Sequence, residues 1–351
     1  MLVENILRDL VSFNTINDKD NNEIMNYICD YLKKYNFNCE MIGNNKKILI
    51  ASIGTKQKLG FVGHTDTVNY KETFGSNPFE LLEKDGNYYG LGTCDMKGGI
   101  AAMLKAVSEI DFSKLSTGLM LIFTYGEEKD FSGIKYFVNS KIKYPNYLIF
   151  GEPTNNIPMN GSKGAIEYNF EFYGKRAHSS MINESSNINA VMFLSKLLEL
   201  NKYFKKRMCN EYEFKHSTMN YGILKGGEAV NIVSDYTKAS CDFRITKSIA
   251  EYNYVKKFVE KLSKEYNMSY KIGMDFLPFY NNTKIVEKYE EITNNKRKKF
   301  FGLSEASVLN GNKIILGPGP VTAHEDREHI SKESLYKTVE NYKSIIFEIL
   351  K

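Results

Sequence analysis

Histidine and carboxylate side chains recur in this sequence directly after short apolar segments. Imidazole and carboxylate together make a borderline-hard ligand set that suits Zn²⁺, with Co²⁺ or Mn²⁺ as substitutes. The set is larger than one tetrahedral ion needs, whereas two ions that share a carboxylate would use all of it and could activate a water for hydrolysis. The residues are His64, Asp66, Asp95, Glu127, Glu128, Glu152 and His324.

The His64-Thr65-Asp66 motif follows an apolar run that we expect to form a strand. Residues two apart on an extended backbone point to the same face, so one side chain can bind a cation while the other orients it. A histidine alone in this setting would more often be a structural residue with satisfied hydrogen bonds. The presence of the other candidate ligands favours metal binding.

Glu127 and Glu128 are adjacent in the sequence. Their side chains cannot point the same way unless the backbone turns, so we expect the two residues to have different roles. The alternative interpretation is a solvated acidic pair near the start of a helix, where negative charge is favourable to the helix dipole.

Asp95 lies in a glycine-rich loop directly before a helical pattern. An isolated aspartate there would be interpreted as a helix N-cap. The loop does not match the Gly-x-x-x-x-Gly-Lys-Ser/Thr pattern of a phosphate-binding loop. The neighbouring Cys94 could be a nucleophile, but such a thiol needs a general base beside it, and His64 is better used as a ligand. We therefore expect Cys94 to be an unreactive thiol.

Composition and charge exclude several classes of protein. The 351 residues carry a net charge of +5, from 47 basic and 42 acidic residues that are interspersed, so we expect no nucleic-acid partner. No apolar stretch approaches the ~20 residues of a membrane span, and the N-terminus lacks a signal-peptide pattern. The five cysteines, at 29, 39, 94, 209 and 241, form no Cys-x-x-Cys pair. We expect a cytoplasmic protein with reduced thiols and no membrane partner.

Strand and helix patterns alternate along the first part of the chain. Two amphipathic helical patterns come first, and the later elements indicate a mostly parallel sheet covered by helices on both faces. Ligands of such sheets gather beyond the carboxyl ends of strands, where His64, Glu127 and Glu152 fall. Strands are predicted at 47–51, 59–62, 119–123 and 147–150, and helices at 98–110 and 133–140.

From about residue 164 the pattern changes to the order β-α-β-β-α-β, which is typical of a ferredoxin-like domain. A helix is predicted at 188–200, a strand pair at 218–224 and 237–245, and a final strand near 270–272. The chain then returns to the first domain through a helix at 285–292, a strand at 313–316 and a closing helix at 332–350. We therefore predict a catalytic domain from residues 1–163 and 275–351, with an inserted domain at 164–274.

The motifs together resemble the M20 family of co-catalytic zinc metallohydrolases. The resemblance is to the branch that contains acetylornithine deacetylase and succinyl-diaminopimelate desuccinylase, and it extends from about Leu59 to the C-terminus. Two positions differ from the family pattern, Asn69 in place of a proline and Gly126 in place of an aspartate, and neither supplies a ligand. The motifs are Gly63-His64-Thr65-Asp66-Thr67-Val68, Cys94-Asp95-Met96-Lys97-Gly98-Gly99, Gly126-Glu127-Glu128, Gly151-Glu152-Pro153-Thr154, Arg176-Ala177-His178-Ser179-Ser180 and Gly317-Pro318-Gly319 through Ala323-His324.

The resemblance implies a zinc-exopeptidase-like catalytic domain with two Zn²⁺ ions per chain. Asp95 would bridge the ions, Asp66 would fix the tautomer of the His64 ring, and Glu127 would be the general base and acid. The metal ligands would be His64, Asp95, Glu128, Glu152 and His324.

The resemblance also assigns roles to residues of the inserted domain, which would be a lid and dimerisation domain. His178 would reach across a homodimer into the neighbouring site and stabilise the developing oxyanion. Asn231 and Arg244 match positions suited to binding polar groups and carboxylates of the substrate, and the alternative interpretations are a turn residue and a strand-surface charge.

We therefore expect a di-zinc deacylase that cleaves the amide of a small N-acyl amino acid, of the N-acetylornithine or N-succinyl-diaminopimelate type used in amino-acid biosynthesis. The sequence does not separate these two substrates. A dipeptidase or carboxypeptidase of the same family would use the same ions. A catalytically silent metal-binding scaffold is the alternative outside the enzymes, and a cysteine hydrolase acting through Cys94 is a third.

Overall fold

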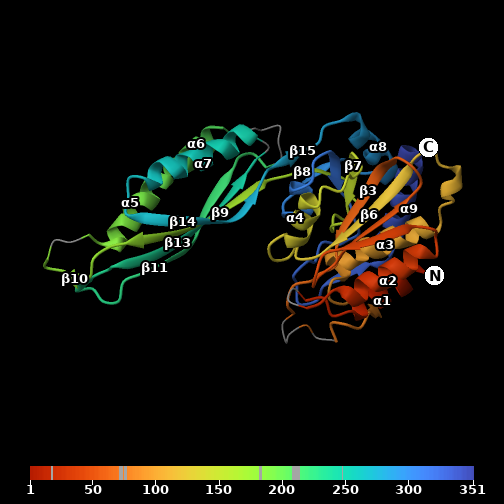
Figure 1. Cartoon of the computed structure of the whole chain (residues 1–351), viewed down its shortest axis with the longest axis horizontal. Coiled ribbons are helices and arrows are strands. Elements are labelled where there is room, and N and C mark those ends of the chain that lie inside the picture. The colour runs from red at the N-terminus through yellow and green to blue at the C-terminus, as the bar shows by residue number, and fades with distance from the viewer. Residues whose placement is uncertain (17–18, 71–73, 75–76, 182–183, 208–213, 247) are drawn as a thin grey trace. The chain divides into compact units, whose positions relative to one another are not determined.

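The computed structural model describes the chain except for residues 17–18, 71–73, 75–76, 182–183, 208–213 and 247, so Cys209 lies outside the described residues. The chain forms two compact units, named here unit 1 and unit 2. Figure 1 shows that both chain ends belong to unit 1 and that the green and teal middle of the chain forms unit 2. Unit 1 contains Met1–Asn160, Asn281–Phe300 and Ser304–Lys351, and unit 2 contains Gly161–Tyr280 and Phe301–Leu303.

Unit 1 is built on a mixed sheet whose four central strands, β6-β3-β7-β17, are parallel. The flanking pairs are antiparallel, including β2 against β6, so the strand predicted at 47–51 exists but does not extend the parallel set. Only residues 54–56 separate β2 from β3, which is far too short for a parallel crossover. The strand order is β1 (Asn38–Ile42), β2 (Ile48–Ile53), β6 (Gly118–Thr124), β3 (Gln57–His64), β7 (Tyr147–Phe150), β17 (Asn312–Ile315), β8 (Met159–Ser162) and β15 (Phe279–Tyr280), with β16 (Lys298–Phe300) beside β8. Of these strands, β15 and the last two residues of β8 belong to unit 2.

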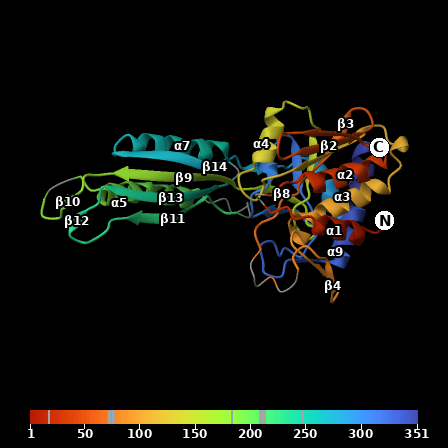
Figure 2. The same cartoon turned by 60° about the horizontal axis from the view of Figure 1, so that its bottom comes forward.

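Helices cover this sheet through apolar faces. α1, α2, α3 and α9 lie together in both views (Figures 1 and 2), and α3 packs against the other three. Because α3 is surrounded in this way, nearly all of its residues are buried, and small residues such as Gly98, Gly99 and Ala102 allow the close packing. The helices of unit 1 are α1 (Val3–Ser12), α2 (Asn22–Lys33), α3 (Gly98–Ser108), α4 (Ser132–Asn139), α8 (Lys284–Thr293) and α9 (Lys332–Leu350).

A small antiparallel sheet, β18-β5-β4, was not predicted from the sequence. It pairs β5 (Asn87–Tyr89) with β4 (Leu82–Lys84) on one side and with β18 (His329–Ser331) on the other. The sheet therefore joins the segment just before Asp95 to the segment just after His324.

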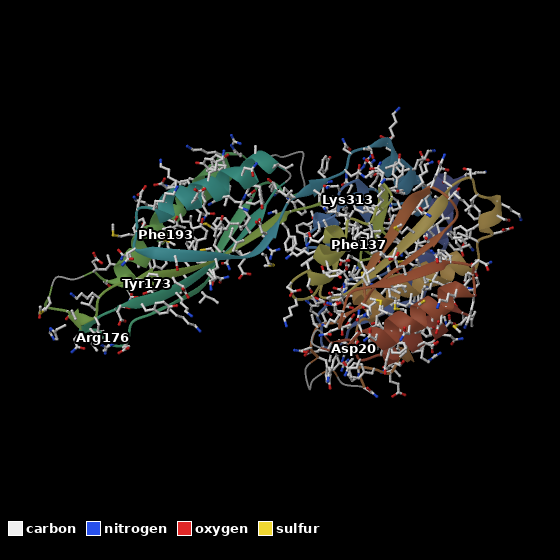
Figure 3. The ribbon with its side chains drawn as sticks, viewed as in Figure 1. Asp20, Phe137, Tyr173, Arg176, Phe193 and Lys313 are labelled. Carbon is white, nitrogen blue, oxygen red and sulfur yellow. The ribbon has the colours of Figure 1, made fainter. Side chains whose placement is uncertain are left out.

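Unit 2 has the predicted β-α-β-β-α-β order, with all strand pairs antiparallel in the order β11-β13-β9-β14. The single helix predicted at 188–200 is two successive helices, α5 and α6. Phe193 of α5, labelled in Figure 3, is fully buried, with its ring centroid 4.9 Å from that of Phe170 on β9. Figure 2 shows α7 running alongside the strands. The elements are β9 (Gly164–Tyr173), α5 (Ser186–Leu197), α6 (Glu199–Lys206), β11 (Thr218–Gly226), β13 (Tyr236–Ile245), α7 (Ile249–Ser263) and β14 (Met268–Phe276).

A two-stranded ribbon, β10 (Ala177–His178) with β12 (Ile232–Val233), adjoins the end of the unit 2 sheet where β9 ends and β13 begins. Among the described helices of either unit, none has the length and apolar character needed to cross a membrane.

Candidate metal centre

Three of the candidate ligands follow the carboxyl ends of neighbouring parallel strands in unit 1. His64 is the last residue of β3, Glu128 comes four positions after the end of β6, and Glu152 comes two positions after the end of β7. Because parallel strands end at the same edge of a sheet, these side chains gather there, where the sequence predicted His64, Glu127 and Glu152 to lie.

His64 is fully buried, and both ring nitrogens have defined neighbours. Nδ1 lies 3.0 Å from the backbone oxygen of Asp66. A carbonyl oxygen only accepts, so Nδ1 carries a proton, and Nε2 is the nitrogen that would bind a metal ion once it has lost its own proton. Nε2 lies 3.0 Å from Oδ1 of Asp95 and 3.6 Å from Oε2 of Glu152. The bond from Nδ1 to the backbone oxygen thus leaves Nε2 as the nitrogen that a metal ion could bind.

His324 forms a second group with two carboxylates. Its Nε2 lies 3.1 and 3.0 Å from the two carboxylate oxygens of Glu128 and 3.8 Å from Oδ2 of Asp95. Asp95 therefore faces His64 with one oxygen and His324 with the other.

Two groups of three ligand atoms, each within 4.8 Å of one another, result from this arrangement. One contains His64, Asp95 and Glu152, and the other contains Asp95, Glu128 and His324. Two groups with one shared carboxylate fit a pair of cations better than a single cation, because one tetrahedral ion could not use all five side chains.

The electrostatics of the centre also fit bound cations. Burial, and then the charge of Glu152, raise the pKa of Glu127 well above its usual value. Burial, and then the charge of Asp95, raise the pKa of Glu152 to about 7. Burial alone would raise the pKa of Asp95 as well, but the hydrogen bond with His64 outweighs it and lowers that pKa. Divalent cations would offset the repulsion between the negative charges of such closely spaced carboxylates.

Asp66 acts differently from the expectation that its carboxylate orients His64. The carboxylate oxygen is 3.6 Å from Nδ1 of His64, and the orienting hydrogen bond goes to the backbone oxygen instead. The Asp66 carboxylate accepts hydrogen bonds from the backbone N–H groups of Glu127, at 3.4 Å, and Glu128, at 3.2 Å. It thereby fixes the backbone turn that carries Glu127 and Glu128.

Buried residues that sequence reasoning missed surround the Asp95 loop. Glu328, 2 % exposed, accepts hydrogen bonds from three backbone N–H groups of this loop. Lys97 is fully buried, donates to the backbone oxygen of Phe13 at 2.8 Å, and has a pKa lowered by burial to about 7. Their only signal in the sequence is proximity to Asp95 or His324, which does not distinguish them from surface charges.

Cys94 is fully buried and belongs to the packing of the centre. Its thiol accepts a hydrogen bond from the backbone N–H of Thr322 at 3.3 Å and donates to the backbone oxygen of Pro320 at 3.4 Å. Burial raises the pKa of the thiol, so the reactive thiolate is disfavoured. These contacts favour the unreactive thiol over the nucleophile.

The three remaining candidate residues lie in unit 2. His178 pairs with Ile232 in the β10–β12 ribbon, and the backbone N–H of Ser179 donates to the backbone oxygen of Asn231 at 3.0 Å. The structure therefore brings His178 and Asn231 together. Arg244 lies at the opposite end of β13, where its Nε donates to Asp242 at 2.8 Å.

Comparison with known proteins gives consistent matches over the chain. The model of peptidase family M20/M25/M40 matches residues 60–348. Acetylornithine deacetylase of Buchnera aphidicola subsp. Schizaphis graminum is 29% identical over 94% of this chain and 94% of its own length. The acetylornithine deacetylase of Pasteurella multocida is 28% identical, over 94% and 91%.

Solved structures match the fold over nearly the whole chain. An aminopeptidase from Bacillus cereus has a TM-score of 0.80 at 20% identity and covers 99% of this chain and 98% of its own. An M20 family metallo-carboxypeptidase from Sulfolobus solfataricus has a TM-score of 0.81 at 16% identity, with the same coverage. The predicted fold class, an α/β catalytic domain with an inserted ferredoxin-like domain, is confirmed. The chain belongs to peptidase family M20/M25/M40 and is a metal-dependent hydrolase of the peptidase and deacylase type.

Proposed function

We propose that this enzyme is a di-zinc deacylase that releases the acyl group from the nitrogen of a small amino-acid derivative, such as N-acetylornithine or N-succinyl-diaminopimelate. The observation that carries the proposal is the pair of ligand groups that share Asp95. His64 and Glu152 would hold one ion, Glu128 and His324 the other, and Asp95 both. Zinc suits this mixture of imidazole and carboxylate, and Co²⁺ or Mn²⁺ could replace it.

Glu127 is the residue that we assign to proton transfer. When bound, the ions would supply the Lewis acidity that polarises the scissile carbonyl and makes a water nucleophilic near neutral pH. Glu127 belongs to neither ligand group, and burial raises its pKa well above the usual value, which makes it a stronger base than an ordinary carboxylate. It would take the proton of the attacking water and deliver it to the leaving amine. Asp66 keeps the Glu127 backbone in place for this task.

His178 is assigned to the developing oxyanion. The backbone N–H of Ser180 points at Nδ1 of His178, at 3.2 Å. Since a backbone N–H only donates, Nδ1 acts as the acceptor and the neutral ring carries its proton on Nε2. The side chain is exposed, so this N–H is available to an oxyanion in another molecule.

We propose that His178 stabilises the oxyanion in the site of a second copy of this chain. The β10–β12 ribbon lies at the far end of the ten-residue strand β9 from the point where the chain enters unit 2, about 30 Å along the strand. Arg244 lies near the entry point, opposite Ala165. We therefore assign His178 and Asn231 to the partner's site, and Arg244 to a carboxylate of the substrate.

An apolar surface on unit 2 supports the homodimer. Ile188, Val191 and Met192 are 59%, 60% and 51% exposed, and their spacing places them on one face of α5. Ile223 and Leu224, on the edge strand β11, are also exposed. The hydroxyl of Tyr221 on β11 donates to the backbone oxygen of Leu194 on α5, so the helix and the edge strand are neighbours. An edge strand beside an apolar helix face suits a self-complementary contact.

Mixing two inactive variants tests this arrangement. In the mixed dimer of His178→Ala and Glu127→Ala chains, one of the two sites has both an intact base and an intact neighbouring histidine. An equal mixture should recover about a quarter of wild-type activity, because half of the dimers are mixed and each has one working site. The absence of recovery despite demonstrated subunit exchange would show that His178 does not act in the partner's site.

Substrate choice is tested by a panel of N-acyl amino acids and dipeptides, with the protein depleted of metal and then reloaded with zinc. The relatives named acetylornithine deacetylase support the deacylase, whereas the structural likenesses to peptidases extend to the fold alone. We expect kcat/KM for an N-acyl amino acid to exceed that for any dipeptide at least about tenfold. A preference for dipeptides would replace the deacylase with a peptidase of the same family, and zinc binding without any hydrolysis would favour a silent scaffold.

We also propose that the enzyme lies in the cytoplasm. A role in amino-acid biosynthesis fits the cytoplasm, and the described cysteines, Cys29, Cys39, Cys94 and Cys241, are all free thiols.

A further inference from the structure

Glu328 is a buried carboxylate that contacts the loop of Asp95 and has no part in the reaction described above. Its Oε1 accepts hydrogen bonds from the backbone N–H groups of Cys94, at 2.8 Å, and Asp95, at 2.9 Å. Its Oε2 accepts one from the backbone N–H of Gly92, at 2.8 Å. Three short bonds from one loop to one side chain define where that loop lies.

All three partners of the Glu328 side chain are donors, so both oxygens must act as acceptors. A carboxylate meets this requirement, because each of its oxygens can accept a hydrogen bond. A glutamine in its place would have to turn an NH₂ group toward at least one backbone N–H, and two donors facing each other cannot bond. The three hydrogen bonds therefore require a carboxylate at this position, and not only a buried side chain of similar size.

Glu328 also connects the Asp95 loop to the segment that carries His324. It lies four residues after His324, and its backbone oxygen accepts a hydrogen bond from Gly90 at 3.3 Å. The next residue, His329, begins strand β18, which pairs with β5 just before the Asp95 loop. A shift of Glu328 would therefore move the loop of one ligand relative to the loop of another.

We propose that Glu328 is a positioning residue for the metal centre, which fixes Asp95 between the two ligand groups. Because Asp95 belongs to both groups, its displacement would weaken both metal positions together. Loss of Glu152 or Glu128 would instead remove a ligand from one group only. The proposal rests on the proposed di-zinc centre.

The test compares Glu328→Gln with Glu251→Gln in the full-length protein. Glu251 is a matched control in unit 2, because it is 4 % exposed and also accepts two hydrogen bonds, from the hydroxyls of Ser217 at 2.6 Å and Thr246 at 3.0 Å. Zinc affinity is measured by competition with a chromophoric chelator, and thermal unfolding is followed with and without zinc. Partners outside the ligand set typically change metal affinity 10- to 100-fold, so we expect a loss of about that size at both positions in Glu328→Gln. Glu251→Gln should bind zinc within about twofold of wild type.

Three outcomes separate this proposal from simpler explanations. In the first, Glu328→Gln unfolds at a lower temperature than wild type and yet shows the same rise in unfolding temperature when zinc is added. In that case Glu328 only stabilises the fold and the proposal is wrong. If Glu328→Gln does not fold, Glu328→Asp decides, since it retains the charge but is too short to reach all three N–H groups, and unchanged zinc affinity in that variant overturns the proposal. If wild-type protein binds no zinc pair, the proposed function itself fails.

Discussion

The zinc affinity of the metal-free enzyme should depend steeply on pH, because protons and zinc compete for the same side chains. A ligand must lose its proton before it binds a metal ion. The hydrogen bond with Glu128 raises the pKa of His324 to about 9, and burial raises that of Glu152 to about 7. Both groups therefore carry a proton more often as the pH falls, so affinity is lost toward acid.

The size of the effect follows from these two values. When the pH falls from 8 to 6, competition by protons lowers the apparent zinc affinity about 90-fold for a ligand of pKa near 9. For a ligand of pKa near 7, the same change lowers it about 10-fold. These two groups alone predict a fall of about 10³-fold in the product of the two zinc affinities, and the raised pKa of His64 makes the fall larger. Burial alone would lower the pKa of His64, but the charge of Glu152 raises it well above the usual value, so about three protons should be released at pH 6 when both ions bind.

Isothermal titration calorimetry in buffers of different ionisation enthalpy measures this proton release directly, and chelator competition gives the affinities. His324→Asn should release about one proton fewer than wild type. His216→Asn is the control, because His216 lies in unit 2 and contacts the backbone oxygen of Ser217. A change in affinity of less than tenfold between pH 8 and pH 6, without proton release, would refute the assignment of His324 and Glu152 as ligands.

Three further predictions follow from the same contacts. Glu127→Gln should keep both zinc ions by elemental analysis but lower kcat by about 10²–10⁴, whereas loss of metal would make Glu127 a ligand. Asp95→Ala should lose both ions and Glu152→Gln only one, so equal zinc contents in these variants would show that Asp95 is not shared. Phe193→Ala should lower the free energy of unfolding of unit 2 by about 3–5 kcal/mol in denaturant titrations, and a change below about 1 kcal/mol would contradict the packing of this fully buried ring.

Much of the centre could be predicted because its residues carry local signals. His64, Glu127 and Glu152 each follow an apolar run, and the edge where parallel strands end brings such positions together without further information. The family and the enzyme class that the motifs indicated are confirmed. The direction of β2 could not be predicted, since an apolar run does not reveal which way its strand runs.

The contacts between distant segments could not be predicted. Glu328 is one of four consecutive charged residues, Glu325-Asp326-Arg327-Glu328, and only the fold shows that it is the buried one. The interruption between α5 and α6 has no glycine or proline to mark it within 186–206. The carboxylate of Asp66 was assigned to the nearby His64, whereas it bonds the backbone of residues some sixty positions later.

Crystals of the zinc-loaded enzyme, measured at the zinc absorption edge, test the central claim most directly. We predict two anomalous peaks per chain, one beside His64 and Glu152 and one beside Glu128 and His324, with the Asp95 carboxylate between them. A single fully occupied peak, with Glu128 or Glu152 turned away from it, would contradict the shared-carboxylate centre on which this account depends.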